Sequence, residues 1–288
     1  VRCAACTLHT QNAIPYFLAL PVAAGSSLLV SSGISNALPA GRFKTMLQLP
    51  LTVKRIKTEL KLLEQYVHQF VSLTQWYRQV LLDNNLPPAK ITVIPAGLAL
   101  TTHTSDAVWS PAQPGQPLKL VFIGRMQPQK GVHLLIEAAK QFNSRQLQVF
   151  IYGRAEKDAY HAQCVAQSQQ CTHVHWMGFV ERETVVHTLS KYHLLCLPSL
   201  FSEMAPLVIQ EAYAAGIPII ASKVYGNIEQ VKDGVNGLLF DYNNAASLAQ
   251  CISRLVNNPG LLPTLKTNLP MPASFKEVYD AYQRIYLT

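Results

Sequence analysis

From residue 118 to residue 257, short apolar runs alternate with segments of helical periodicity. Apolar strands separated by helices form parallel βαβ units, in which helices cover both faces of the sheet. The pattern predicts a doubly wound α/β domain, and ligands of such sheets bind at the carboxyl ends of the strands. The predicted strands are 119–124, 147–153, 174–176, 194–198 and 217–221, and the predicted helices are 131–142, 155–169, 181–192, 206–215 and 245–257.

The chain before residue 118 is organised differently. Its periodicity predicts helices over 54–70 and 75–82 and strands over 71–74 and 90–94. Residues 98–117 contain three prolines and several Thr and Ser, a composition typical of an interdomain linker. We therefore predict a first domain in 1–98, a linker in 99–117, a second domain in 118–269 and a terminal segment in 270–288 whose helix covers 275–287.

Most of the net charge of +8 lies in the first hundred residues, which hold nine Lys or Arg against three Asp or Glu. A basic surface attracts anionic lipid head groups, nucleic acid or an anionic substrate. No zinc-finger, helix-turn-helix or RNP-type pattern accompanies these charges, so no nucleic-acid partner is expected. An anionic membrane surface stays open as a partner.

The six cysteines are scattered along the chain, which favours a reduced, cytoplasmic setting over a disulfide framework. Cys3 and Cys6 have only His9 nearby, and a structural zinc site needs four ligands, so no metal site is predicted. The span 13–30 is uncharged, but its prolines and glycine favour core or interfacial packing over a membrane span.

Two carboxylates bracket the start of an apolar helix. Glu203 and Glu211 lie eight positions apart, Pro206 suits the first helical position, and Gly216 suits the helix end. The plainer alternatives are that Glu211 lies on the solvent face of the helix, and that Glu203 only offsets the helix dipole.

Backbone amides at this helix start suggest what the carboxylates bind. The free amides of Leu207 and Val208 would form an anion site at the positive end of the helix. Two carboxylates repel a bare phosphate, but the hydroxyls of a phosphate-linked sugar donate hydrogen bonds to carboxylates. The arrangement therefore predicts a sugar-nucleotide site.

Basic residues follow the first strand of the same domain. Arg125 and Lys130 lie five positions apart after that strand, so their side chains can converge on one diphosphate. Gly124 lets the backbone approach a ligand closely. An ordinary exposed loop is the alternative interpretation.

Seven segments, taken together, resemble glycosyltransferase family 4, whose members are retaining enzymes with the two-domain GT-B fold. The resemblance covers roughly residues 70–288, and the order and spacing of its segments are specific. The segments are Phe-Ile-Gly-Arg-Met-Gln-Pro-Gln-Lys-Gly at 122–131, Trp-Met-Gly-Phe-Val at 176–180, Leu-Pro-Ser at 197–199, the E-x7-E motif at 203–211, Ala-Gly-Ile-Pro-Ile-Ile-Ala-Ser at 215–222, Gly-Asn-Ile-Glu-Gln-Val at 226–231 and Asp-Gly-Val-Asn-Gly at 233–237.

This resemblance implies roles for the site residues. Arg125 and Lys130 would hold the donor diphosphate and stabilise the departing nucleotide, Glu203 would face the transferred sugar, and Glu211 would accept from the ribose hydroxyls. The resemblance implies no cofactor and no metal, with the nucleotide sugar as co-substrate. Gly124, Ala205, Pro206, Leu207 and Val208 would lie near the phosphates, and Gly178, Phe179 and Val180 would border the base.

Family members carry a longer N-terminal domain than residues 1–98 provide. The resemblance therefore implies an N-terminally truncated GT-B-like chain, with a complete donor domain and a partial N-terminal acceptor domain. It also implies that segment 270–288 packs back on the N-terminal domain.

The leading hypothesis is a retaining glycosyltransferase of cell-envelope polysaccharide synthesis that moves a sugar from a nucleotide-sugar donor to a glycan or lipid-linked acceptor. Its expected location is the cytoplasm, or peripherally the inner face of the membrane. Two alternatives stay open: an inactive sugar-nucleotide-binding fragment, and a basic module that binds membrane surfaces or nucleic acid. A dinucleotide-dependent oxidoreductase is disfavoured because no G-x-G-x-x-G follows a predicted strand.

Overall fold

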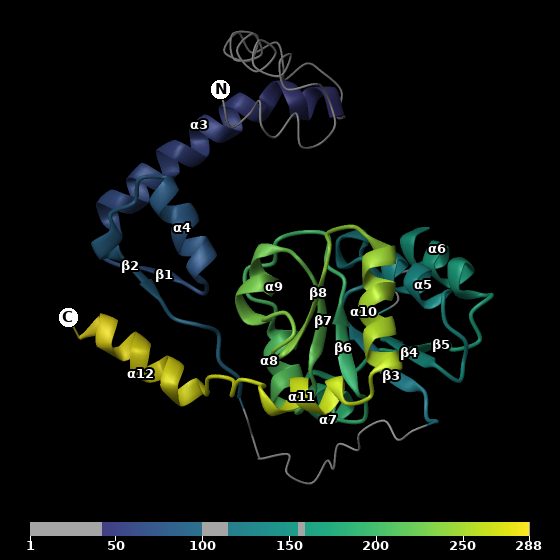
Figure 1. Cartoon of the computed structure of the whole chain (residues 1–288). Coiled ribbons are helices and arrows are strands. Elements are labelled where there is room, and N and C mark those ends of the chain that lie inside the picture. Colours follow the sequence, from purple (N-terminus) through teal and green to yellow (C-terminus); the bar gives the residue numbers. More distant parts are fainter. Residues whose placement is uncertain (1–41, 100–114, 155–158, 288) are drawn as a thin grey trace. The chain divides into compact units, whose positions relative to one another are not determined.

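The computed structural model describes residues 42–99, 115–154 and 159–287, with side chains from residue 52 onward (Figure 1). Several predictions fall outside these ranges. They concern Cys3, Cys6, the uncharged span 13–30 and most of the linker 99–117. The chain divides into two compact units, one containing residues up to 70 together with 81–90, and the other containing 71–80 and the residues from 91 onward. The predicted domain boundaries stay predictions.

The part of the chain before residue 99 holds two α-helices and a small sheet among its described residues. Its last helical turn before the first strand is held by Lys90, whose Nζ donates to the carbonyls of Glu64 (2.6 Å) and Val67 (3.0 Å). A cation at this position satisfies carbonyls that the helix end leaves unpaired. The elements are α3 (Arg42–Tyr66), β1 (Phe70–Ser72), α4 (Gln75–Asp83) and β2 (Ile91–Val93), and β1 pairs with β2. The predicted first helix thus begins earlier and ends earlier than expected.

The second unit is built on a six-stranded sheet in which every described pairing is parallel. The spatial order is β5-β4-β3-β6-β7-β8, so the chain builds outward from β3 and then returns to its other side as β6. The strands are β3 (Leu118–Ile123), β4 (Leu147–Tyr152), β5 (Val174–Gly178), β6 (Leu194–Leu197), β7 (Ile219–Ser222) and β8 (Gly237–Phe240). This sheet confirms the predicted doubly wound α/β architecture.

Helices cover both faces of the sheet (Figure 1). Successive side chains of β3 face opposite sides, as a strand requires. Leu120 and Phe122 pack into one core with α5, α10 and α11, whereas Val121 packs into the other with α7 and α8. The helices are α5 (Val132–Ala139), α6 (Ala159–Ser168), α7 (Val185–Leu189), α8 (Leu207–Ala214), α9 (Tyr225–Gln230), α10 (Ala245–Asn257) and α11 (Leu261–Thr267).

The terminal helix α12 (Phe275–Tyr286) begins with a capping box, in which the Ser274 and Glu277 side chains each bond to the other's backbone N–H. Just before it, the N–H of Leu98 donates to the carbonyl of Ala273 over 2.9 Å, and a β-bridge joins Leu98 to Ser274. The helix lies where the sequence predicts it. Its packing on an N-terminal domain stays a prediction.

Candidate functional site

Two loops meet where the strand order of the large sheet reverses, between the carboxyl ends of β3 and β6. Crevices of this kind hold the ligands of doubly wound sheets. The N–H of Leu200, after β6, donates to the carbonyl of Gln129, after β3, over 2.7 Å. The main chain therefore ties together the two loops that carry Arg125, Lys130 and Glu203.

Gly131 fixes the geometry of the first loop. Its φ of +70° lies in the left-handed region, and a Cβ atom placed on it would lie 1.9 Å from the carbonyl oxygen of Pro198. No residue with a side chain fits this position without backbone movement. Gly131 lies between Lys130 and α5, so its fixed conformation also fixes the position of the Lys130 backbone.

Lys130 and Glu203 form an ion pair in this crevice. The distance from Lys130 Nζ to Glu203 Oε2 is 2.7 Å, and the side chains are only 14% and 10% exposed. The ammonium group also lies 5.3 Å from the centroid of the Phe201 ring, a favourable cation–π distance. The structure therefore brings two predicted site residues into direct contact and places them largely out of water.

A row of buried polar side chains supports Glu203 from the protein interior. Ser199 Oγ donates to Glu203 Oε1, and Ser222 Oγ donates to the Ser199 carbonyl over 2.7 Å. Asn227 Nδ2 in turn donates to the Ser222 carbonyl (3.1 Å) and hydroxyl (3.2 Å). Ser199, Ser222 and Asn227 have no exposed surface. Among the described residues, Asn227 Oδ1 is a buried side-chain oxygen without a hydrogen-bond partner.

Helix α9 holds the Glu203 main chain through a close backbone approach. A Cβ atom on Gly226, near the start of this helix, would lie 1.8 Å from the Glu203 carbonyl oxygen. Only glycine allows this contact. The position of Glu203 is therefore fixed at both its side chain and its backbone.

Helix α8 begins immediately after this loop, one residue later than predicted. Pro206 is extended (ψ 113°) and precedes the first helical residue, Leu207. The N–H of Ile209 bonds to the Pro206 carbonyl, which leaves the amides of Leu207 and Val208 at the helix start. An amide pair at a helix N-terminus favours an anion.

Glu211 lies on the second turn of α8 and is partly buried. Burial raises the pKa of its carboxyl group above the ordinary value, and the positive charge of Arg182 opposes the rise. A carboxylate on the solvent face of the helix would show no such effect, so the structure argues against the surface alternative.

The remaining predicted residues lie in loops at the same carboxyl edge. Arg125 is exposed, and the Gly124 carbonyl oxygen would lie 2.6 Å from a Cβ atom on Gly153. Gly178 is the last residue of β5 and has a φ of +77°, and Phe179, which follows it, is 53% exposed.

Phe179 has a partner that the sequence analysis missed. The guanidinium carbon of Arg154 lies 4.9 Å from the centroid of its ring. Arg154 comes one glycine after the end of β4, as Arg125 comes one glycine after the end of β3, and this position was its only signal. Ser222 and Asn227 lay in the quoted segments 215–222 and 226–231, but nothing in those segments predicted that the two side chains bond to each other. Ser199 lay in the Leu-Pro-Ser segment, but nothing there predicted its bond to Glu203.

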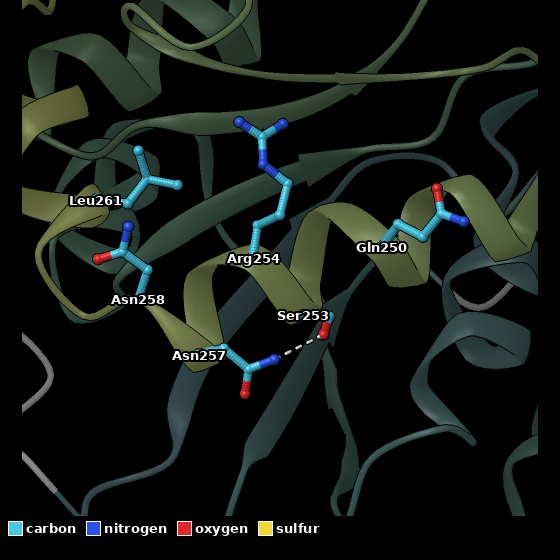
Figure 2. A pocket seen from close by; sticks show the side chains of 6 residues that line it. All are labelled: Gln250, Ser253, Arg254, Asn257, Asn258 and Leu261. Carbon is cyan, nitrogen blue, oxygen red and sulfur yellow. Dashed lines mark hydrogen bonds between the residues drawn. The ribbon is translucent and has the colours of Figure 1, made fainter.

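A surface cavity of about 560 Å³ lies away from these loops, along α10 and the start of α11 (Figure 2). Its lining holds one charged side chain, Arg254, and the amide of Asn257 is bonded to Ser253 over 3.0 Å. Such a surface lacks the converging charges found at the β3–β6 crevice, so we place the candidate site at the crevice. The lining residues are Gln250, Ser253, Arg254, Asn257, Asn258 and Leu261.

Two other kinds of site have no counterpart in the described ranges 42–99, 115–154 and 159–287. Within them, no group of three or more His, Cys, Asp or Glu side chains is arranged to hold a metal ion. None of the helices that the structure describes has the length and apolar character needed to cross a bilayer.

A family model described as glycosyl transferases group 1 matches residues 105–269. This match covers more than half of the chain and contains all the predicted site residues. The putative colanic acid biosynthesis glycosyltransferase WcaL of Salmonella typhimurium is 29% identical over 170 residues, which are 57% of this chain and 41% of that protein. A D-inositol 3-phosphate glycosyltransferase of Kribbella flavida is 28% identical over 193 residues, which are 62% of this chain and 45% of that protein. The chain thus spans less than half the length of these relatives.

Among solved structures, Anabaena Alr3699/HepE in complex with UDP and glucose matches with a TM-score of 0.69 and 21% identity. The match covers 81% of this chain and 66% of that one. At this identity the likeness shows the fold, and it confirms the predicted GT-B-like α/β class.

Proposed function

Because this chain belongs to the group 1 glycosyl transferases, we propose that it binds a nucleotide sugar in the β3–β6 crevice and serves sugar transfer to a glycan or lipid-linked acceptor. The observation that carries this proposal is the buried Lys130–Glu203 pair, which lies a few residues before the helix N-terminus at Leu207. A cation, a carboxylate and free amides together suit a ligand that combines phosphates with hydroxyl groups.

Each side chain has a task in this proposal. Arg125, Lys130 and the first amides of α8 bind the diphosphate and stabilise the charge that develops on the leaving nucleotide. Glu211 accepts hydrogen bonds from the ribose hydroxyls, and Glu203 accepts one from the transferred sugar. Phe179 offers an exposed ring beside the base.

The biological setting is part of the same proposal. The relative named for colanic acid biosynthesis supports a role in cell-envelope polysaccharide synthesis. We place the reaction in the cytoplasm or at the inner face of the membrane, with retention of configuration at the sugar and without a metal ion.

Titration calorimetry of the chain with UDP-glucose, GDP-glucose and ADP-glucose tests the donor site. We expect saturable one-to-one binding of at least one of them, and no binding of glucose alone. Absence of binding for all three would refute the site. Sugar transfer to a glycan or lipid-linked acceptor, measured with the same chain, then decides between an active enzyme and the inactive nucleotide-sugar-binding alternative.

A membrane-surface module is the second candidate function, and helix α3 is the observation that favours it. The spacing of Lys54, Lys57 and Lys61 places them on one face of the helix. Ile56 and Leu63 lie on a different face and are 47% and 46% exposed. Basic helices with exposed apolar residues bind anionic interfaces. Salt-sensitive sedimentation with phosphatidylserine vesicles, independent of nucleotide sugar, is the expected result. Equal recovery with neutral vesicles would contradict it.

A further inference from the structure

The Lys130–Glu203 pair joins two groups to which the proposed function gives different partners. Lys130 is assigned to the diphosphate and Glu203 to the sugar, yet in this structure the two are bonded to each other at 2.7 Å. While this bond is in place, it occupies one N–H donor of Lys130 and the Glu203 oxygen that Ser199 does not contact. When the donor diphosphate draws Lys130 away, the bond is exchanged, and the exchange links two parts of the ligand.

The two partners are not equally free to move. Glu203 is held by Ser199 at one carboxylate oxygen and by the close approach of Gly226 at its backbone. Lys130 reaches the other oxygen through a flexible four-carbon chain. When the pair opens, the ammonium group is the part that moves, and the carboxylate stays in place.

Opening the pair leaves a carboxylate that is 10% exposed with one neutral hydrogen bond from Ser199. A buried charge without its partner is strongly unfavourable, so the freed oxygen needs a new donor. A sugar hydroxyl next to the diphosphate supplies one. A nucleoside diphosphate without a sugar does not.

We propose that the Lys130–Glu203 bond is an exchangeable latch. The donor diphosphate takes Lys130 out of this bond, and a sugar hydroxyl of the donor replaces Lys130 as the hydrogen-bond donor to Glu203. This inference rests on the proposed function and adds a mechanism of selection to it. The latch disfavours a nucleoside diphosphate alone, because that ligand takes Lys130 and leaves Glu203 unpaired. It accepts a nucleotide sugar, because both groups then have partners, and it favours release of the nucleotide once the sugar has gone.

Titration calorimetry of the whole chain, wild type and Glu203→Gln, tests the latch. The probes are UDP, GDP and ADP and their glucose conjugates, and the comparison uses the base that the wild type binds best. In Glu203→Gln, Lys130 has no ion pair to break, so we expect the nucleoside diphosphate to bind about tenfold more tightly than in the wild type. The extra affinity that the attached glucose provides should fall at the same time.

Two further variants make the result specific. Ser199→Ala removes the other hydrogen bond to Glu203. Separating Lys130 from Glu203 then costs more free energy, so nucleoside diphosphate binding should weaken. The opposite sign of these two changes is the signature of a latch, and Ser199→Ala decides the matter if Glu203→Gln does not fold. Asp241→Asn is the matched control, because it breaks the exposed 2.7 Å pair with Lys223 and should change neither affinity.

Weaker nucleoside diphosphate binding in a folded Glu203→Gln protein, or unchanged binding in both variants, would overturn the latch. Those outcomes leave the proposed function standing, since the wild type still binds the donor. Failure of the wild type to bind any of the six probes would refute the proposed function and the latch together.

Discussion

At the scale of single residues, burial of Glu211 makes donor binding depend on pH. Its carboxyl pKa lies above the ordinary value of 4.5, and the ionised form accepts hydrogen bonds from the ribose hydroxyls more strongly than the protonated form does. As the pH falls through the raised pKa, donor affinity should therefore fall. Glu211→Gln should flatten this dependence and weaken binding at neutral pH by about 1.5–3 kcal/mol, as measured by calorimetry over a pH series.

The same shift fixes the sign of a stability effect. The folded state binds the Glu211 proton more tightly than the unfolded state, so ionisation as the pH rises lowers the free energy of unfolding. Glu211→Gln should therefore fold at least as stably as the wild type at neutral pH.

The control for the binding prediction is Glu137→Gln, on the exposed side of α5, which should leave donor binding unchanged. If Arg125→Ala and Glu211→Ala each bound the nucleotide sugar with wild-type affinity, the assignment of the site would be wrong.

His193 should make the whole chain less stable in mild acid. Its side chain is 6% exposed, and its Nδ1 accepts from the N–H of Lys119 over 2.9 Å. Burial lowers its pKa from 6.5 to about 4, with a smaller contribution from the charge of Lys119. The unfolded state thus binds a proton first as the pH falls below 6.5, and stability is lost between there and about 4.

Urea unfolding at several pH values measures this loss, which should reach up to about 1.4 kcal/mol per pH unit from this group. His193→Asn keeps an acceptor for the Lys119 N–H and cannot be protonated, so its slope should be shallower. His133, whose pKa burial also lowers, accounts for part of the slope that remains. A slope equal to that of the wild type would contradict the role given to His193.

The sequence singled out charged residues of the candidate site but not the bonds between them. Lys130 was noted for its spacing from Arg125 after a strand, and Glu203 and Glu211 for their positions around the start of a helix. The hydroxyl groups that support Glu203 were not predicted in that role, since Ser199 and Ser222 become neighbours only through the pairing of β6 with β7. Contacts made across a sheet have no local signal in the chain.

At the scale of elements, α9 should control the site through Gly226. A Cβ atom there would lie 1.8 Å from the Glu203 carbonyl oxygen, so Gly226→Ala must move the helix or the Glu203 loop. We expect a loss of about 1–3 kcal/mol in stability and weaker donor binding, measured by thermal unfolding and calorimetry.

Gly260 provides a matched control for this substitution. It precedes α11, and the nearest atom to an added Cβ, Asn258 Oδ1, lies 3.5 Å away. Gly260→Ala should change stability by no more than about 0.5 kcal/mol and leave donor binding intact. Similar effects of the two alanine substitutions would show that the close approach at Gly226 does not matter.

Element prediction succeeded where an apolar run is fully buried and failed where an element contains or directly follows turn-type residues. All four residues of both β6 and β7 are buried, so their apolar runs stood out clearly. Helix α9 has six residues, two of them glycine and asparagine, and strand β8 directly follows a turn. Their form depends on neighbours such as Glu203, and periodicity does not record those contacts.

At the scale of the whole molecule, the proposed donor site should work without a metal ion. Arg125, Lys130 and the start of α8 supply positive charge to the diphosphate in this proposal. Donor affinity measured by calorimetry should therefore be the same before and after dialysis against EDTA. Loss of binding that Mg²⁺ or Mn²⁺ restores would contradict metal independence.

The fold class followed from the sequence because the alternation of strand and helix is a property of the entire second unit. The strand order did not follow in the same way. Periodicity predicts which segments are strands, but the placing of β6 beside β3 depends on crossovers that span many residues. The sequence therefore placed the candidate residues in loops at the carboxyl edge, and the structure shows that the loops after β3 and β6 are neighbours there.

The backbone bond between Leu200 and Gln129 makes the separation of the two loops of this crevice measurable. Loop amides in contact with water exchange their hydrogen for deuterium quickly, but this N–H is held at 2.7 Å by the facing loop. It can exchange only when the two loops separate. The deuterium uptake of a single peptide that contains Leu200 therefore reports how often the loops after β3 and β6 separate.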